Sequence, residues 1–225
     1  MKCVVFDSSS LIGMSMSCLL GELKKLKGSF DGKFIITREV ESEVVTRPIS
    51  IKKFELEAMR VKQLIDEKIL EFPEDVGVKS SEVTKKINEI DKLANNAYLG
   101  KREPIKIIHS GETSCIALCQ ILNEKKIENV LCVDERTTRL LIEKPENLLE
   151  LLQRKLHTEI RFDSSKIKNF GKIKVLRSTE LMYVAYKKKL LDVKGPQVLD
   201  ALLYALKFKG CSISDDEIKE IKNLK

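Results

Sequence analysis

Two short apolar runs in this chain each end on an aspartate. Cys3–Phe6 leads into Asp7, and Val130–Val133 leads into Asp134. Apolar runs without polar alternation are typical of strands that are buried on both faces of a parallel sheet. Because ligands and reactive groups in open α/β sheets gather beyond the carboxyl ends of the strands, we expect both aspartates to face one crevice.

The remainder of the chain alternates strand and helix patterns. Further strands are predicted at 34–36 and 173–176, and residues 69–72 fit either a minor strand or a loop. Helical periods are predicted over 11–27, 37–46, 82–99, from 110, from 136, and over 146–156, 179–189, 196–208 and 215–223. Residues 157–171 are expected to be a polar connector. This order predicts a single α/β domain over 1–225 with a short, mainly parallel sheet.

Composition restricts the classes of partner and compartment. The net charge is +7, from 41 Lys and Arg against 34 Asp and Glu. A basic surface around an acidic crevice suits nucleic acid, although many of these charges simply solvate helix faces. Six cysteines without a CxxC pair indicate reduced thiols rather than disulfides or zinc ligands.

The sequence does not predict membrane association. Its uncharged stretches fall short of the roughly 20 residues that a membrane span needs. Residues 8–21 are uncharged, but Asp7 interrupts the front of this segment and no good cleavage site follows it. We therefore expect a cytoplasmic protein without a signal peptide.

Two further acids lie where the crevice could recruit them. Glu43 lies beside the apolar pair Val40 and Val44, and Glu112 follows Gly111 in the first turn of a helix. Each acid also has an ordinary structural interpretation. Glu43 could pair with Arg47, Glu112 could favour the helix dipole, and the two aspartates could cap helices.

Four converging carboxylates would raise one another's pKa values unless a cation lay among them. Oxygen ligands without His or Cys select Mg²⁺ or Mn²⁺ over zinc. Such ions can hold a phosphodiester, activate a water and stabilise the leaving oxygen. The pattern therefore predicts metal-assisted phosphodiester hydrolysis.

At these residues the chain resembles the PIN-domain family of metal-dependent nucleases. The similar stretches are Val4–Ile12, Ile35–Val44, His109–Leu118, Leu131–Arg136 and Gly195–Ile213. The resemblance implies a three-layer α/β/α fold, to which the helices at about 52–103 and the segment at about 140–170 are additions. Each motif alone is loose, and the order and spacing of the set carry the resemblance.

The resemblance also assigns roles to individual residues. Asp7, Glu43, Glu112 and Asp134 match the acidic positions of the family and would bind Mg²⁺ or Mn²⁺. Glu39 and Glu41 compete for the second of these positions. Ser9 matches a small polar residue that hydrogen-bonds within the cluster, and Glu135 is an auxiliary acid. The family usually cuts RNA, and in some members DNA.

Basic residues near the rim are candidates for phosphate contacts. They are Arg47, Lys52, Lys53, Arg136 and Arg139. Aromatic residues make up only 5% of the chain and Trp is absent. Recognition is therefore expected to rest on phosphate contacts and substrate shape more than on stacked bases.

Several functions remain open beside an active ribonuclease. The second hypothesis is a catalytically silent RNA-binding or scaffold module. A phosphatase of the haloacid-dehalogenase type ranks lower, because Ser9 stands where its second aspartate is needed. A homodimer is compatible with the resemblance. An antitoxin partner is not favoured, because toxins of this type are usually much shorter.

Overall fold

A four-stranded parallel sheet lies at the centre of the computed structural model, which describes residues 1–101, 103–168 and 170–224. The strands are β1 (Lys2–Phe6), β2 (Lys33–Ile35), β4 (Glu128–Cys132) and β6 (Val175–Leu176), in the order β2-β1-β4-β6. Every pairing in this sheet is parallel. The predicted α/β class with a short parallel sheet is therefore confirmed.

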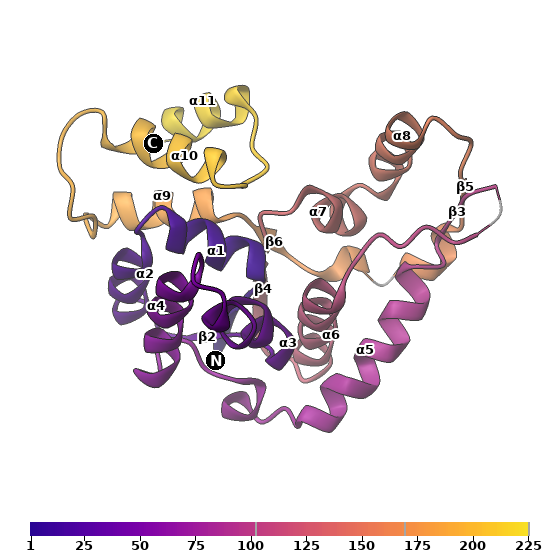
Figure 1. The fold of residues 1–225 in the computed structure, drawn as a ribbon, viewed down its shortest axis with the longest axis horizontal. Helices are drawn as coiled ribbons and strands as arrows, with labels where there is room; N and C mark the ends of the chain where they lie inside the picture. Colours follow the sequence, from indigo (N-terminus) through magenta and orange to yellow (C-terminus); the bar gives the residue numbers. More distant parts are fainter. Residues whose placement is uncertain (102, 169, 225) are drawn as a thin grey trace.

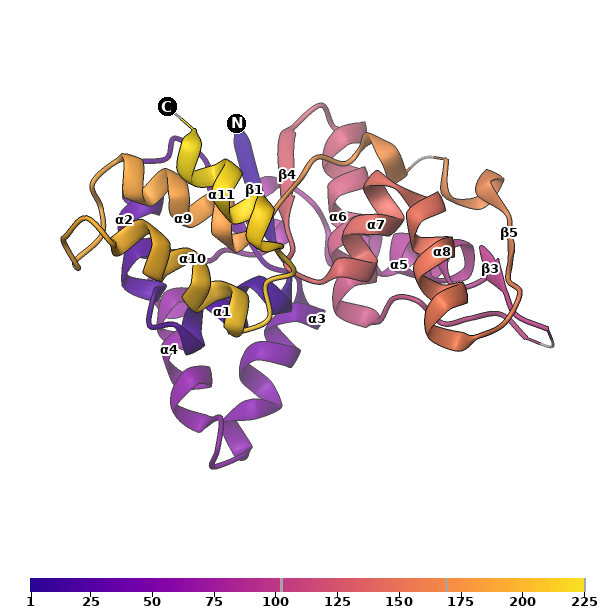
Figure 2. The ribbon, with the colours of Figure 1, turned by 90° about the horizontal axis from the view of Figure 1, so that it is seen from above.

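Helices cover both faces of the sheet (Figures 1 and 2). On one face lie α1 (Ser8–Met16), α2 (Leu20–Gly28) and α9 (Ser178–Lys187). On the other face α6 (Ser110–Glu124) packs against β1 and β4, with α5 (Ser80–Ala94) outside it. Strand β1 is buried because it has a strand on each side and a helix layer on each face. Val5 and Phe6 accordingly have no exposed surface.

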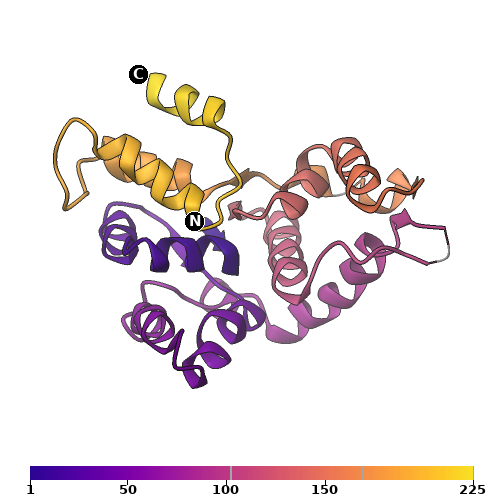
Figure 3. The same cartoon turned by 45° about the horizontal axis from the view of Figure 1, so that its top comes forward.

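The C-terminal helices form an outer layer beside α9. Helix α10 (Val198–Phe208) contacts α9, and α11 (Asp215–Asn223) contacts α10, as the orange and yellow segments of Figure 3 show. Arg177, just before α9, forms ion pairs with Glu180 and with Glu217 of α11. No helix in the described ranges has the length and apolar character that a membrane crossing needs.

The predicted helix over 11–27 is two helices in the structure. Helix α1 ends at Met16 and α2 begins at Leu20. Between them Cys18 has a φ of 58°, a left-handed conformation that a helix cannot continue through. Periodicity did not reveal this break, because the apolar positions of the two helices continue one common spacing.

The segment after β2 also departs from a simple helix. Thr37 caps it as expected, because its hydroxyl oxygen accepts a hydrogen bond from the Val40 amide at 3.2 Å. Helix α3 (Arg38–Glu41) then widens into the π-helical turn η1 (Ser42–Thr46), and Pro48 begins the short 3-10 helix η2 (Pro48–Ser50). Further on, Glu71 of the 69–72 segment bridges to Ile35 and extends the edge of the sheet.

The later part of the 52–103 segment meets the 140–170 segment in a lobe on the far side of α6. Strand β3 (Tyr98–Leu99) pairs antiparallel with β5 (Arg161–Phe162), and the Tyr98 and Phe162 rings stack at 4.7 Å. The Tyr98 hydroxyl donates to the Pro145 carbonyl oxygen at 2.9 Å. The expected connector 157–171 therefore contains a strand, followed by the short 3-10 helices η4 (Ser164–Ile167) and η5 (Phe170–Lys172).

Three more α-helices and one 3-10 helix complete the described architecture. Helix α4 (Glu55–Asp66) packs on α1 and η1, so the 52–103 region divides between two sides of the sheet. Helices α7 (Arg136–Glu143) and α8 (Pro145–Leu156) link β4 to the lobe. A further 3-10 helix, η3 (Pro73–Val76), precedes α5. The six cysteines are all free thiols, and every one except Cys18 is buried.

The lobe predicts a graded stability effect at Tyr98. Tyr98→Phe should cost about 1 kcal/mol, because the Pro145 carbonyl loses its buried donor. Tyr98→Ala should cost about 3–5 kcal/mol, because the cavity beside Phe162 is added to that loss. Urea unfolding measures both values. Tyr183→Phe is the control, since the Tyr183 hydroxyl bonds to Leu224 at the surface. Equal small effects of all three substitutions would contradict a packed lobe.

Candidate acidic site

Each strand of the main sheet delivers a polar residue at its carboxyl end. Asp7 directly follows β1, while Thr37, Asp134 and Ser178 stand two residues beyond the ends of β2, β4 and β6. All four residues are buried to at least 99%. The Asp7 amide donates to the Cys132 carbonyl oxygen at 2.9 Å, which extends the β1–β4 pairing up to the first acid. The sheet therefore places these four side chains along one edge.

Asp7 is a buried acid with one satisfied and one unsatisfied oxygen. Its Oδ2 accepts hydrogen bonds from the Ser9 amide at 3.0 Å and from the Ser9 hydroxyl at 2.5 Å. Its Oδ1 is buried and has no hydrogen-bond partner among the described residues. An unpaired oxygen of this kind is costly in a folded interior, so it points to a ligand or an ion.

The electrostatics of Asp7 tie it to two other acids. Burial raises the pKa of its carboxyl to about 7, and the negative charges of Glu112 and Glu43 add to the increase. The hydrogen bonds from Ser9 oppose this shift, because they favour the ionised form. The charges of Glu43 and Glu112 thus both act on Asp7, and we call these three acids the acidic edge.

Glu43 is held by the start of helix α6. It belongs to the π-helical turn η1, and its Oε1 accepts from the Gly111 amide at 3.2 Å and the Ser110 hydroxyl at 3.4 Å. A Cβ added at Gly111 would lie 2.4 Å from Glu43 Oε2, so only glycine permits this approach. The alternative interpretation, an ion pair with Arg47, does not occur among the described residues. The competing Glu41 instead accepts a hydrogen bond from the Thr46 hydroxyl at 3.0 Å.

Glu112 both caps the start of helix α6 and acts electrostatically on Asp7. Its Oε2 accepts from the His109 amide at 2.9 Å, as expected of an acid in the first turn of a helix. Its charge nevertheless acts on Asp7, 105 positions earlier in the chain. Because the hydrogen bond uses one oxygen, the other remains available to the site.

Asp134 lies at the same edge of the sheet, but its carboxylate does not bond as we expected of one of four acids facing a common crevice. Its Oδ1 accepts from the Ser178 amide at 2.8 Å and its Oδ2 from the Ser178 hydroxyl at 2.6 Å. Burial raises its pKa, and the bonds from Ser178 oppose that rise. Both oxygens are therefore used to hold the start of α9. Sequence reasoning missed Ser178, although a serine just past the last predicted strand was an available signal.

Ser9 connects Asp7 with Asp134. Its hydroxyl donates to Asp7 Oδ2 and accepts from the Asp134 amide at 3.1 Å. This single side chain therefore joins the ends of β1 and β4. Glu135, the expected auxiliary acid, instead caps α7 by accepting a hydrogen bond from the Thr138 amide at 2.6 Å.

The candidate phosphate-binding residues fall into two separate places. Arg47 and Lys53 line a groove that also contains Glu43. Arg136 and Arg139 line a different cleft, between α7 and the 207–217 segment. Arg139 is partly occupied, since it donates to the Ser212 carbonyl oxygen at 2.9 Å. Lys52 forms a surface ion pair with Glu55 at 2.9 Å.

The acidic edge offers oxygen atoms that hard cations prefer, but its side chains are not arranged as a set of metal ligands. Among the described residues, no group of three or more His, Cys, Asp or Glu side chains is arranged so that it could hold a metal ion. The unpartnered Asp7 Oδ1 is nevertheless an oxygen of the kind that Mg²⁺ or Mn²⁺ binds. Asp7, Glu43 and Glu112 would have to shift from their present positions to hold such an ion together.

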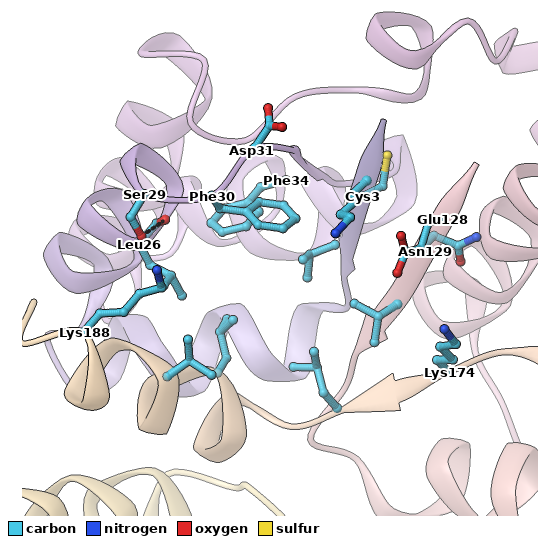
Figure 4. A pocket seen from close by; sticks show the side chains of 16 residues that line it. Cys3, Leu26, Ser29, Phe30, Asp31, Phe34, Glu128, Asn129, Lys174 and Lys188 are labelled. Carbon is cyan, nitrogen blue, oxygen red and sulfur yellow. Dashed lines mark hydrogen bonds between the residues drawn. The ribbon is translucent and has the colours of Figure 1, made fainter.

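A second hollow lies at the opposite, amino end of the strands (Figure 4). It has a volume of about 350 Å³ between the sheet and helices α2 and α9, with Phe30, Phe34 and Leu26 among its walls. Lys174, Lys188, Asp31 and Glu128 all line it. Its charges are of both signs and its walls are largely apolar. It therefore differs from the acidic edge at the other end of the strands.

Comparison with known proteins adds no further identification. No family model, no curated protein and no solved structure matches the chain.

The raised pKa of Asp7 predicts a specific dependence of stability on pH. Because the folded-state pKa of about 7 lies above the ordinary value of 3.8, Asp7 lowers the stability of the metal-free protein as pH rises through that interval. Asp7→Asn should therefore stabilise the protein in EDTA near about pH 8, by up to about 4 kcal/mol, and much less near about pH 5.

Thermal unfolding of both proteins across this pH range measures the effect. Asp66→Asn is the control, since Asp66 forms a surface ion pair with Lys62 and should show no such trend. A stability difference between wild type and Asp7→Asn that does not change with pH would contradict the buried, raised-pKa acid.

Proposed function

We propose that this protein is a Mg²⁺- or Mn²⁺-dependent nuclease that hydrolyses phosphodiester bonds within RNA. The observation that carries the proposal is Asp7, a buried carboxylate with an unpartnered Oδ1 that shares its electrostatic environment with Glu43 and Glu112. Without a counter-charge this arrangement destabilises the fold. A divalent cation would remove that cost, which supports a metal-binding role.

The resemblance to PIN-domain nucleases supports the same chemistry. A bound divalent cation would supply Lewis acidity and an activated water for phosphodiester hydrolysis. The protein's own residues then act by positioning. Ser9 fixes the orientation of Asp7, the Gly111 amide fixes Glu43, and the His109 amide fixes Glu112. These contacts hold each acid by one oxygen and leave the other oxygen free to bind.

Asp134 has a supporting role in this proposal. Because both its oxygens accept from Ser178, it joins the end of β4 to the start of α9. Its amide also holds the Ser9 hydroxyl that orients Asp7. A change at Asp134 that moves its backbone would therefore disturb Asp7 through Ser9, and no direct bond from Asp134 to the metal is required.

The basic residues support a nucleic-acid substrate. Arg47 and Lys53 lie beside Glu43, and Arg136 is exposed near the start of α7. Such side chains contact phosphates and contribute sequence-independent affinity. We place the activity in the cytoplasm and on RNA, with DNA as the alternative polymer.

A catalytically silent RNA-binding or scaffold module is the second candidate. Two observations favour it. Both Asp134 oxygens are already satisfied, and no ready metal-holding group of side chains is present in the described ranges. In that case the raised pKa of Asp7 would leave a neutral carboxyl that serves only as a helix cap.

A cleavage assay distinguishes the two candidates. Wild-type protein should cut total RNA in Mn²⁺ or Mg²⁺, stop in EDTA, and leave 5′-phosphate ends that can be mapped. Asp7→Asn should reduce the rate by at least about 100-fold, because the acid that carries the free oxygen is lost.

RNA binding by filter retention is measured in parallel. Asp66→Asn is again the matched control and should cut at the wild-type rate. If wild-type protein and the Asp7→Asn and Asp134→Asn variants all retain RNA equally and none cuts it, the scaffold function replaces the nuclease.

Gly111→Ala tests the position of Glu43 without removing its charge. The new Cβ would overlap the end of the flexible Glu43 side chain, so the carboxylate must move while the backbone stays. We expect a stability change within about 1 kcal/mol, because alanine favours the helix. The cleavage rate should fall by about 100-fold, because a displacement of about 1 Å in a catalytic group can reduce the rate by that factor.

Gly28→Ala is the control for this experiment, since a Cβ there meets nothing within 4 Å. It should leave the cleavage rate unchanged and should not lower the melting temperature, because Gly28 ends helix α2 and alanine favours a helix. Wild-type cleavage by Gly111→Ala would show that Glu43 has no role at the site.

A further inference from the structure

Large apolar side chains are exposed in one place beside the acidic edge. Ile12 and Met16 of α1 face Ile51 and Phe54 of the segment before α4, and each is at least 40% exposed. All four line one groove of about 420 Å³, which we call the Phe54 groove. A contiguous apolar surface of this kind marks a binding site more often than a solvated face.

The Phe54 groove is continuous with the acidic edge. Glu43 lines the groove, and its Oε1 is the atom that the Gly111 amide holds in the acidic edge. Val44 of the same π-helical turn also lines it, together with Pro48. A ligand in the groove would therefore lie directly beside the Glu43 carboxylate.

The rim of the groove carries cations suited to phosphate. Arg47 and Lys53 line it, and within the described ranges neither forms an ion pair with a carboxylate. The Lys53 ammonium lies 5.1 Å from the centroid of the Phe54 ring. An exposed aromatic ring beside unpaired cations can contact a base face and the adjoining phosphates together.

We infer that the Phe54 groove binds one unstacked nucleobase of a single-stranded nucleic acid, next to the acidic edge. This inference rests on the proposed function. A base inside a duplex is stacked on both faces and paired along one edge, so it cannot enter the groove without being extruded. Phe54 therefore provides the stacking surface that the low aromatic content had argued against.

Binding to two probes of equal charge tests the base site without cleavage. The probes are a short single-stranded RNA and an abasic strand of the same length, each carrying a fluorophore, and anisotropy is read in EDTA. Wild type should bind the base-bearing strand about tenfold more tightly, the scale of one base–aromatic stack. Phe54→Ala should remove this preference and leave binding of the abasic strand unchanged.

Two further variants complete the design. Ile51→Ser should reduce the same preference, and because Ile51 is 48% exposed it leaves the fold intact. Phe208→Ala is the matched control, since Phe208 is 78% exposed on α10 and lies outside the groove. It should bind both strands as wild type does. Melting curves confirm that every variant is folded.

The outcomes separate the base site from the nuclease. Equal binding of the two strands by wild type, or an unchanged preference in Phe54→Ala, overturns the base site even if the protein cleaves RNA. A preference lost in Phe54→Ala supports it even if no cleavage occurs. If Phe54→Ala alters only the oligomeric mass in light scattering, the groove is an interface between copies of the chain and the inference fails.

Discussion

The parallel pairing of β1 with both β2 and β4 is the constraint on which the acidic edge depends. Val5 lies opposite Ile35 on one side and Leu131 on the other, so the carboxyl ends of three strands stop at one level. Asp7 then follows the central strand into the interior. Ser9 bonds both to Asp7 and to the Asp134 amide. A shift of this register would break that link and would move Asp7 away from the two glutamates whose charges act on it.

Burial of the ionised Asp7 carboxylate lowers the free energy of unfolding of the protein. The carboxyl is 1% exposed, two neighbouring acids raise its pKa further, and one oxygen has no donor. Folded proteins keep such costs mainly where they serve binding or chemistry. The apolar core around β1 offsets the cost, and the glycine at 111 and the π-helical turn at 42–46 bring Glu43 into range. Stability and the proposed function therefore oppose one another at this edge.

Much of this arrangement could be predicted from the sequence, because it follows from local patterns. The apolar runs before Asp7 and Asp134 indicated central strands, and Thr37 and Ser110 marked helix starts that the structure contains. The break at Cys18 and the widening at Ser42 could not be predicted, because both depend on backbone conformations that apolar spacing does not encode. The serine after the last predicted strand was an available signal, but the sequence did not show that Asp134 would turn both oxygens toward it, because β6 lies 41 or more positions away. The pairing of β3 with β5 joins segments whose contact has no local signal.

The central claim is that Asp7, Glu43 and Glu112 bind a divalent cation, and Mn²⁺ binding tests it most directly. Electron paramagnetic resonance of free Mn²⁺, titrated with wild-type protein near about pH 8, where Asp7 is ionised, should show stoichiometric loss of the signal of the free ion. The same titration with Asp7→Asn should leave that signal nearly unchanged, while the surface variant Asp66→Asn should behave as wild type. Equal Mn²⁺ binding by wild type and Asp7→Asn, or none by either, would contradict the account.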